Sequence, residues 1–198
     1  MLAEYAQHDD VLAVSMPVDY WDYLGWTDTL ASPANSQRQR DYASSRGDRM
    51  VYTPQVIING IAAAPGYDQR IIDNTISTTK SQLGGNRVLV DMGSSGEEIV
   101  VRVDAAIEGG EYRSGTLWLM LFEKQVVVPV ARGENAGRTI AYTNVVREMT
   151  PVGTWNGDKA VYTLPKADLM SRGHEGCAVL LQSGMAGPII GAAILDSW

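Results

Sequence analysis

The sequence predicts an α/β layer followed by an all-β region, and three observations support this prediction. A β-branched run at residues 51–58 enters through Thr53-Pro54 and ends at Asn59-Gly60, a dipeptide that favours a tight hairpin turn. Helical periodicity follows at residues 67–83. Beyond Gly84 the spacing of apolar residues changes from about 3.6 to about 2, which is typical of strands.

The first half of the chain is predicted to alternate between helices and strands. Residues 1–8 contain helix formers, and the near-continuous apolar run at residues 11–16 suits a strand buried on both faces of a parallel sheet. Residues 19–26 mix two Trp and two Tyr with two Asp, which predicts a loop or a single helical turn. Ser32 followed by Pro33 predicts the start of a helix that Gly47 ends.

The helix that follows Ser32 is predicted to have one solvated and one buried face. Arg38, Gln39 and Arg40 are expected to face solvent, and Tyr42 is expected to face the core.

The second half is predicted to form an antiparallel β-sandwich or barrel. Gly84-Gly85-Asn86 is the best candidate for a domain boundary, which divides the chain into residues 1–85 and residues 86–198. The strand candidates are residues 87–92, 98–105, 115–122, 125–131, 139–149, 158–164, 178–183 and 189–196.

The composition excludes several classes of function. A formal net charge of −7, from 16 Lys and Arg against 23 Asp and Glu, argues against a nucleic-acid partner. No apolar run approaches the roughly 20 residues that a membrane helix needs, so no membrane insertion is expected. The single cysteine, Cys177, excludes an internal disulfide and a zinc pair of cysteines within these residues. No metal and no cofactor is predicted, and the sequence assigns no oligomeric state.

Several stretches point to a known family. They are residues 18–26, Arg38-Gln39-Arg40 with Tyr42, residues 51–55 with Asn59-Gly60, residues 135–139 and residues 144–147. In this order they resemble the bacterial family DUF1223, which comprises secreted or periplasmic proteins of thioredoxin-like fold. The resemblance implies that residues 1–85 form a thioredoxin-like domain without its first βα unit. It also implies a periplasmic or secreted location, although the chain contains no signal peptide.

The sequence departs from the family pattern in two places. Family members usually carry a CxxC motif upstream of the segment that matches residues 2–8, and Pro17 stands where a histidine is common. The missing strand would lie between residues 11–16 and residues 51–58. Leaving both unpaired costs roughly 1 to 3 kcal/mol for each buried group without a partner. We therefore expect Met1 to be an internal methionine, or the gap to be closed by direct pairing or by another subunit.

Thr53-Pro54 is the strongest functional candidate. The resemblance implies a cis proline whose preceding residue pairs with an extended peptide. The alternative is an ordinary proline at the entrance of an edge strand.

The aromatic loop is the second candidate. It either forms a binding groove beside the proline, or its Trp rings are core and its Asp residues cap a turn. Asp19 and Asp22 lie three residues apart and could share a proton, but for catalysis the capping role is favoured. No catalytic residue is predicted, and the candidate binding residues are Thr53, Pro54, Asp19, Tyr20, Trp21, Asp22 and Trp26.

Three further motifs favour structural roles. Cys177 could be activated by His174, but a buried structural thiol is the usual outcome in such a turn. Residues 133–139 are similar to a phosphate-binding loop but lack its lysine, so a turn is favoured. Arg138 and Arg147 are expected to bind carboxylates within the sandwich or between the domains.

The predicted function is that of a thioredoxin-like protein from a thiol-disulfide oxidoreductase family. The chain itself is expected to be redox-inactive, because one cysteine cannot complete a dithiol exchange cycle. The alternative is a non-catalytic module that holds an extended peptide or an envelope component with the Pro54 edge and the aromatic loop.

Overall fold

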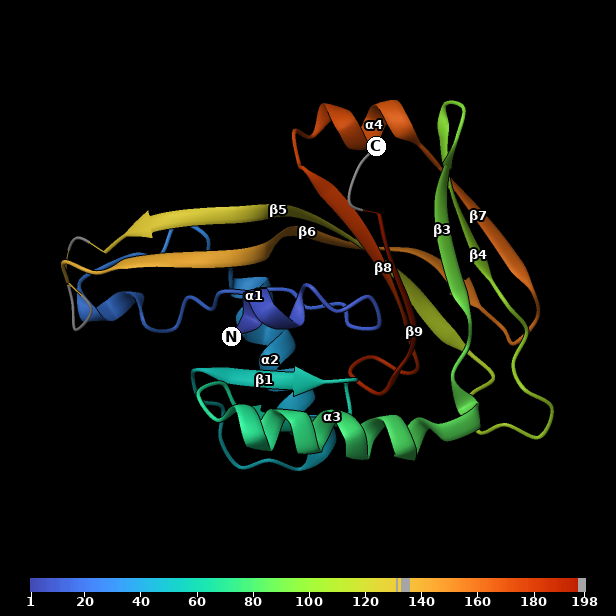
Figure 1. The fold of residues 1–198 in the computed structure, drawn as a ribbon, viewed down its shortest axis with the longest axis horizontal. Helices are drawn as coiled ribbons and strands as arrows, with labels where there is room; N and C mark the ends of the chain where they lie inside the picture. The colour runs from blue at the N-terminus through green and yellow to red at the C-terminus, as the bar shows by residue number, and fades with distance from the viewer. Residues whose placement is uncertain (131, 133–135, 196–198) are drawn as a thin grey trace.

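The computed structural model describes residues 1–130, 132 and 136–195, and shows a mixed α/β fold with several antiparallel sheets (Figure 1). Its helices are α1 (Leu2–Tyr5), α2 (Pro33–Arg46), α3 (Gln69–Leu83) and α4 (Lys166–Ser171), with 3-10 turns at Asp22–Leu24 and Gly84–Asn86. Its strands are β1 (Gln55–Ile58), β2 (Ala62–Pro65), β3 (Val90–Ser95), β4 (Glu98–Val103), β5 (Gly115–Pro129), β6 (Thr139–Trp155), β7 (Ala160–Pro165), β8 (Gly176–Gln182) and β9 (Ile189–Leu195).

The predicted hairpin is confirmed as the antiparallel pair β1–β2. Asn59 and Gly60 have φ values of 51° and 68°, the positive angles that a tight hairpin turn requires. Ile58 and Ala64 from the two strands pack against Ile72 of α3 in one buried cluster. The amphipathic helix therefore covers one face of the hairpin.

The boundaries of α2 follow the predicted capping residues. The Ser32 side chain accepts a hydrogen bond from the Asn35 backbone N–H at 3.3 Å, and Pro33 occupies the first helical position. Gly47 ends the helix with φ 75°. Local sequence chemistry therefore sets the two ends of this helix.

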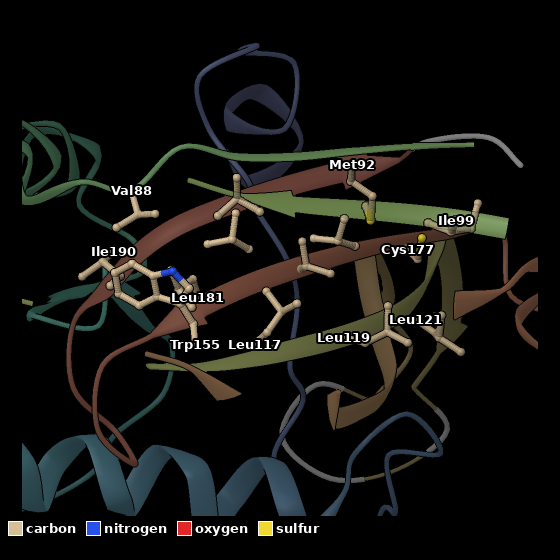
Figure 2. Packing of buried hydrophobic residues seen from close by; sticks show 14 of the residues in the cluster. Val88, Met92, Ile99, Leu117, Leu119, Leu121, Trp155, Cys177, Leu181 and Ile190 are labelled. Atoms are coloured by element: carbon tan, nitrogen blue, oxygen red, sulfur yellow. The ribbon is translucent and has the colours of Figure 1, made fainter. Parts of the chain in front are cut away.

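The second half consists of two antiparallel sheets, with strand orders β3-β4-β7 and β6-β5-β8-β9. Buried side chains from both sheets form one cluster (Figure 2). Trp155 is fully buried in it and satisfies its indole N–H by donating to the Asp158 carbonyl at 2.7 Å. The main core of the protein therefore lies between these sheets.

The prediction of a strand at residues 11–16 was wrong. The segment forms no strand and joins no parallel sheet with β1, and its isolated parallel bridge pairs Ser15 with Val145 of β6. Leu12, Val14 and Met16 pack on the outer face of the four-stranded sheet. The apolar run is thus buried against β5, β6 and β8, a cover that the run itself cannot specify.

Two details of the β region also differ from prediction. Residues 115–122 and 125–131 were expected to be separate strands, but β5 runs through Glu123 and Lys124 with a register irregularity after Leu121. Helix α4 was not predicted. Part of the predicted turn at residues 133–139, and residue 196 at the end of the last predicted strand, lie outside the described residues.

Contacts cross the predicted domain boundary at residue 85. The Ile189 N–H donates to the Asn59 carbonyl at 2.8 Å, and the Tyr142 hydroxyl donates to Asp28 at 2.7 Å. The division into two domains stays a prediction. Within the described residues, no helix combines the length and the apolar character needed to cross a bilayer.

Gly60 is predicted to be required where the tip of the β1–β2 hairpin contacts the turn between β8 and β9. A Cβ at Gly60 would lie 2.3 Å from the Gly187 carbonyl oxygen, whereas Gly47 has a similar positive φ and open space around it. A left-handed conformation costs a non-glycine residue roughly 1–2 kcal/mol in either case. We expect Gly60→Ala to lower the free energy of unfolding by at least about 1 kcal/mol more than Gly47→Ala, measured by urea denaturation. Equal losses would show that the turn contact contributes nothing.

Candidate functional site

Thr53 and Pro54 lie at the exposed entrance of β1. The peptide bond between them is cis. The Pro54 carbonyl accepts a hydrogen bond from the Gly66 N–H at 2.8 Å, and a Cβ on Gly66 would lie 2.9 Å from the Pro54 Cβ. The close approach of Gly66 therefore holds the proline segment in place.

The aromatic loop lies directly beside Thr53. The Trp21 Nε1–H donates to Thr53 Oγ1 at 2.9 Å. The Trp21 ring stacks on Tyr23 with centroids 6.4 Å apart, and Tyr20 lies 5.4 Å away on a tilt. Trp21 is 43% exposed and Tyr23 77% exposed, so these rings are not core.

Gln39 of α2 holds the loop and the strand entrance together. Its side-chain carbonyl accepts a hydrogen bond from the Tyr20 hydroxyl at 2.9 Å. Its Nε2 donates to the Tyr52 carbonyl and to Gln55 Oε1, each at 2.9 Å. The prediction of a solvated Gln39 was therefore wrong, because the helix turns this amide towards β1.

The two loop carboxylates accept hydrogen bonds from different parts of the chain. Asp19 accepts a hydrogen bond from the Ser36 hydroxyl, which in turn accepts one from the Asp19 N–H. Asp22 accepts one from the Asp28 N–H at 3.3 Å. Asp22 thus bonds a backbone N–H, as the capping interpretation expected, whereas Asp19 bonds the Ser36 side chain on α2. Trp26 is half-buried and makes no ring contact with the aromatic residues around Trp21 among the described residues.

Two further aromatic residues flank the site and were missed. Tyr52 precedes Thr53 and is 38% exposed, and Tyr67 follows Gly66 and is 77% exposed. Their position beside Thr53-Pro54 and Gly66 in the sequence was the available signal. We refer to Trp21, Tyr23, Tyr52 and Tyr67 as the aromatic rim.

Arg38 also departs from its predicted solvated position. Its guanidinium lies 5.0 Å from the Tyr42 ring centroid and 5.6 Å from that of Trp118 on β5. It donates to Gln182 Oε1 on β8 at 2.8 Å. This arginine therefore joins α2 to the four-stranded sheet. Tyr42 is buried, as predicted.

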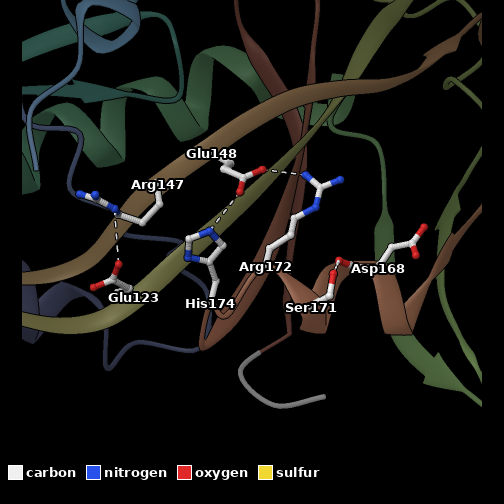
Figure 3. A network of polar contacts seen from close by, with 7 residues as sticks. All are labelled: Glu123, Arg147, Glu148, Asp168, Ser171, Arg172 and His174. Carbon is white, nitrogen blue, oxygen red and sulfur yellow. Dashed lines mark hydrogen bonds and ion pairs between the residues drawn. The ribbon is translucent and has the colours of Figure 1, made fainter.

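The Cys177 thiol lies in the core and not in a site. Its side chain is fully buried, as Figure 2 shows, and burial raises its pKa to about 12. The His174 ring lies 3.2 Å from Glu148 Oε1, on the network drawn in Figure 3. The structural interpretation of Cys177 is the one that the geometry supports.

The two arginines that the sequence analysis singled out, Arg138 and Arg147, make structural contacts. Arg147 forms an ion pair with Glu123 at 3.4 Å, which agrees with its predicted role (Figure 3). The Arg138 carbonyl accepts a hydrogen bond from Val130 at 2.8 Å. Residues 133–135 of the loop that is similar to a phosphate-binding loop lie outside the described residues. The described residues contain no group of three His, Cys, Asp or Glu placed to hold a metal ion.

Comparison with known proteins places the chain in a family. The model for "Protein of unknown function (DUF1223)" matches residues 1–182. The chain belongs to the DUF1223 family. An X-ray crystal structure of a structural-genomics target from Agrobacterium tumefaciens is similar to this DUF1223 protein, with 33% identity and a TM-score of 0.84 over 98% of this chain and 84% of that one. A comparison of this chain with curated proteins found no match.

The Glu148 network predicts a pH dependence of stability. Burial raises the pKa of Glu148, but hydrogen bonds from Arg172 at 2.6 Å and from His174 outweigh burial and lower that pKa below its ordinary value of 4.5. The stabilisation is therefore complete above about pH 4.5 and is lost as the pH falls through the lower folded-state pKa. We expect Glu148→Gln to reduce the unfolding free energy at pH 7 by about 1 kcal/mol or less, since the pair is partly exposed.

Urea denaturation of this DUF1223 protein between pH 7 and pH 3 tests the effect. The difference between the wild type and Glu148→Gln should narrow towards pH 3. Glu108→Gln, at an exposed position, is the matched control and should change nothing. A constant difference across the range would contradict the assignment.

Proposed function

We propose that this DUF1223 protein binds an extended peptide along the Thr53-Pro54 entrance of β1, with the aromatic rim as its apolar contact. The observation that supports this most directly is the Trp21 to Thr53 hydrogen bond, which sets exposed aromatic rings beside an exposed strand entrance. The family resemblance also supports a periplasmic or secreted location.

The strand edge is the first support for a peptide ligand. β1 pairs with β2 alone, and no other strand of the described residues pairs with its second edge. Extended peptides bind such edges through main-chain hydrogen bonds, and neighbouring side-chain contacts give specificity. The family resemblance assigns that second edge to a further strand, so the main-chain groups that we propose for a peptide are those of exposed Thr53, just before β1.

The aromatic rim is the second support. Trp and Tyr combine a large apolar area with a polar tip, and they are enriched where proteins bind partners. Tyr23 and Tyr67 are each 77% exposed and lie on opposite flanks of the Thr53-Pro54 segment in the sequence. Exposed aromatic residues in three segments that each adjoin Thr53, Pro54 or their bonded neighbours favour a contact surface over chance exposure.

The arrangement of helices supports a thioredoxin-like α/β layer. Val56 and Ile58 of β1 pack with α3, whereas Gln55 contacts Gln39 of α2. Because side chains alternate along a strand, Gln55 faces the side of β1 opposite to Val56 and Ile58, and its bond to Gln39 brings α2 to that side of the strand entrance. A hairpin covered by α3, with an exposed Thr-Pro at its entrance, agrees with the layer that the family resemblance implies.

This chain is predicted not to exchange disulfides by itself. Thiol exchange needs an accessible thiolate, whereas the Cys177 thiol is fully buried with its pKa raised by burial to about 12. We expect the 198-residue chain to reduce insulin no faster than its Cys177→Ala variant, measured as turbidity with dithiothreitol present. Turnover above that variant would refute the claim.

Peptide binding is predicted to depend on the rim. The probe is S-carboxymethylated insulin B chain carrying a fluorescent label, an unfolded polypeptide without free thiols. Removing an aromatic anchor from a contact typically costs more than 1 kcal/mol, so we expect Tyr23→Ala and Trp21→Ala each to weaken binding about fivefold to tenfold in fluorescence anisotropy. Tyr23→Ala leaves the Trp21 to Thr53 bond intact.

Met185→Ala is the control, because Met185 is 86% exposed in the turn between β8 and β9. It should bind the probe like the wild type. No binding at concentrations up to the millimolar range, or equal losses in Met185→Ala and Tyr23→Ala, would disprove the proposal. Circular dichroism of each variant separates lost contact from lost fold.

A further inference from the structure

A pocket of about 660 Å³ lies where the end of α2, the tip of the β1–β2 hairpin and the turn between β8 and β9 meet. Its volume falls within the range of pockets that hold small molecules. The lining residues that matter here are Arg46, Asp48, Met50, Tyr52, Ile61 and Pro188. The pocket is lined by neither Thr53 nor Pro54, and it shares one residue, Tyr52, with the aromatic rim.

Among the residues that line this pocket, Arg46 has a hydrogen-bond donor without an acceptor. Its side chain is only 11% exposed. Its Nε and Nη2 both donate to one oxygen, Asp48 Oδ2, at 3.0 and 2.6 Å. Its Nη1 is buried and has no acceptor among the described residues. A buried guanidinium N–H without an acceptor is costly, and an acceptor that entered the pocket would remove that cost.

The charge of the surrounding loop favours an anion. Residues 46–49 contain two arginines, Arg46 and Arg49, and one carboxylate, Asp48, in a chain whose net charge is −7. A hydrogen bond from a guanidinium N–H to a carboxylate is charge-assisted and therefore stronger than one between neutral groups. The positive balance is therefore local, and it coincides with the unpaired Nη1.

The lining residues favour a ligand whose charged group is attached to an apolar body. Met50, Ile61 and Pro188 are apolar lining residues, and Tyr52 is an aromatic one. The Tyr52 carbonyl is held by Gln39 at 2.9 Å, which fixes the backbone on this side. Sites for small ligands commonly combine mostly apolar walls with a few placed polar groups.

We propose that this pocket binds a small carboxylic acid with an apolar body, whose carboxylate pairs with Arg46 while the body contacts Met50 and Tyr52. The acceptor then satisfies Nη1, and the two remaining nitrogens keep their bond to Asp48. This inference does not depend on peptide binding at Thr53.

The test compares 4-phenylbutyrate with 4-phenylbutanamide, which differ in charge but hardly in shape. Isothermal titration calorimetry with the whole chain should show binding of the acid, and at least tenfold weaker binding of the amide. Arg46→Met should weaken binding of the acid at least tenfold. Asp48→Asn should strengthen it, because it removes the competing carboxylate. Arg49→Met is the matched control, with an expected change below threefold.

Equal affinity for acid and amide would mean that the pocket recognises only the apolar body, and it would overturn the proposal. So would the absence of acid binding at millimolar concentration, or equal effects of Arg46→Met and Arg49→Met. If Arg46→Met does not fold, Asp48→Asn decides, since unchanged or weaker binding there contradicts the charge argument. Binding of the labelled B chain is measured separately, so failure of one proposal leaves the other testable.

Discussion

A buried amide, that of Gln182 at the end of β8, joins the two halves of the molecule. Its side chain is fully buried, so every polar atom needs a partner. Its Oε1 accepts from Arg38 at 2.8 Å, and its Nε2 donates to the Tyr42 hydroxyl at 2.9 Å and to the Gly187 carbonyl at 2.8 Å. One side chain thereby fixes α2 and the turn that holds the hairpin tip. Loss of Arg38 or Tyr42, the two partners on α2, would leave a polar atom of the buried Gln182 amide without one of its hydrogen bonds. Because such a loss is costly, these bonds favour a single position of α2 on the sheet.

The candidate peptide site depends on this joint through α2. Arg38 and Gln39 are consecutive residues, so the helix that anchors Arg38 to the sheet also sets the direction of Gln39. Gln39 then bonds the loop at Tyr20 and the strand entrance at Tyr52. The position of the aromatic loop relative to β1 therefore depends on the contacts between α2 and the four-stranded sheet.

The sequence was sufficient where local chemistry decides the structure. Ser32, Gly47 and the Asn59-Gly60 turn act within a few residues, and the helix and the hairpin formed as predicted. It was insufficient where a distant partner decides. The apolar run at residues 11–16 is equally consistent with several covers, and only the tertiary fold pairs Ser15 with Val145. Long polar side chains such as Arg38 and Gln39 are exposed by default, so their inward contacts could not be predicted from type alone. Gln182 within an apolar strand was a visible signal of a buried polar anchor.

The contribution of Trp21 to the site can be separated from its contribution to the fold. Its indole N–H is near the surface, so water can replace Thr53 Oγ1 as its acceptor, and the net worth of that bond is about 1 kcal/mol. Gln39 makes three hydrogen bonds around the same segment, and Asp19 is bonded twice to Ser36. The conformation of the loop therefore depends mainly on α2, with Trp21 as a minor support. It follows that the exposed ring area of Trp21 and Tyr23 is available for contact with a ligand without being required for folding, a combination that a purely structural aromatic cluster does not have.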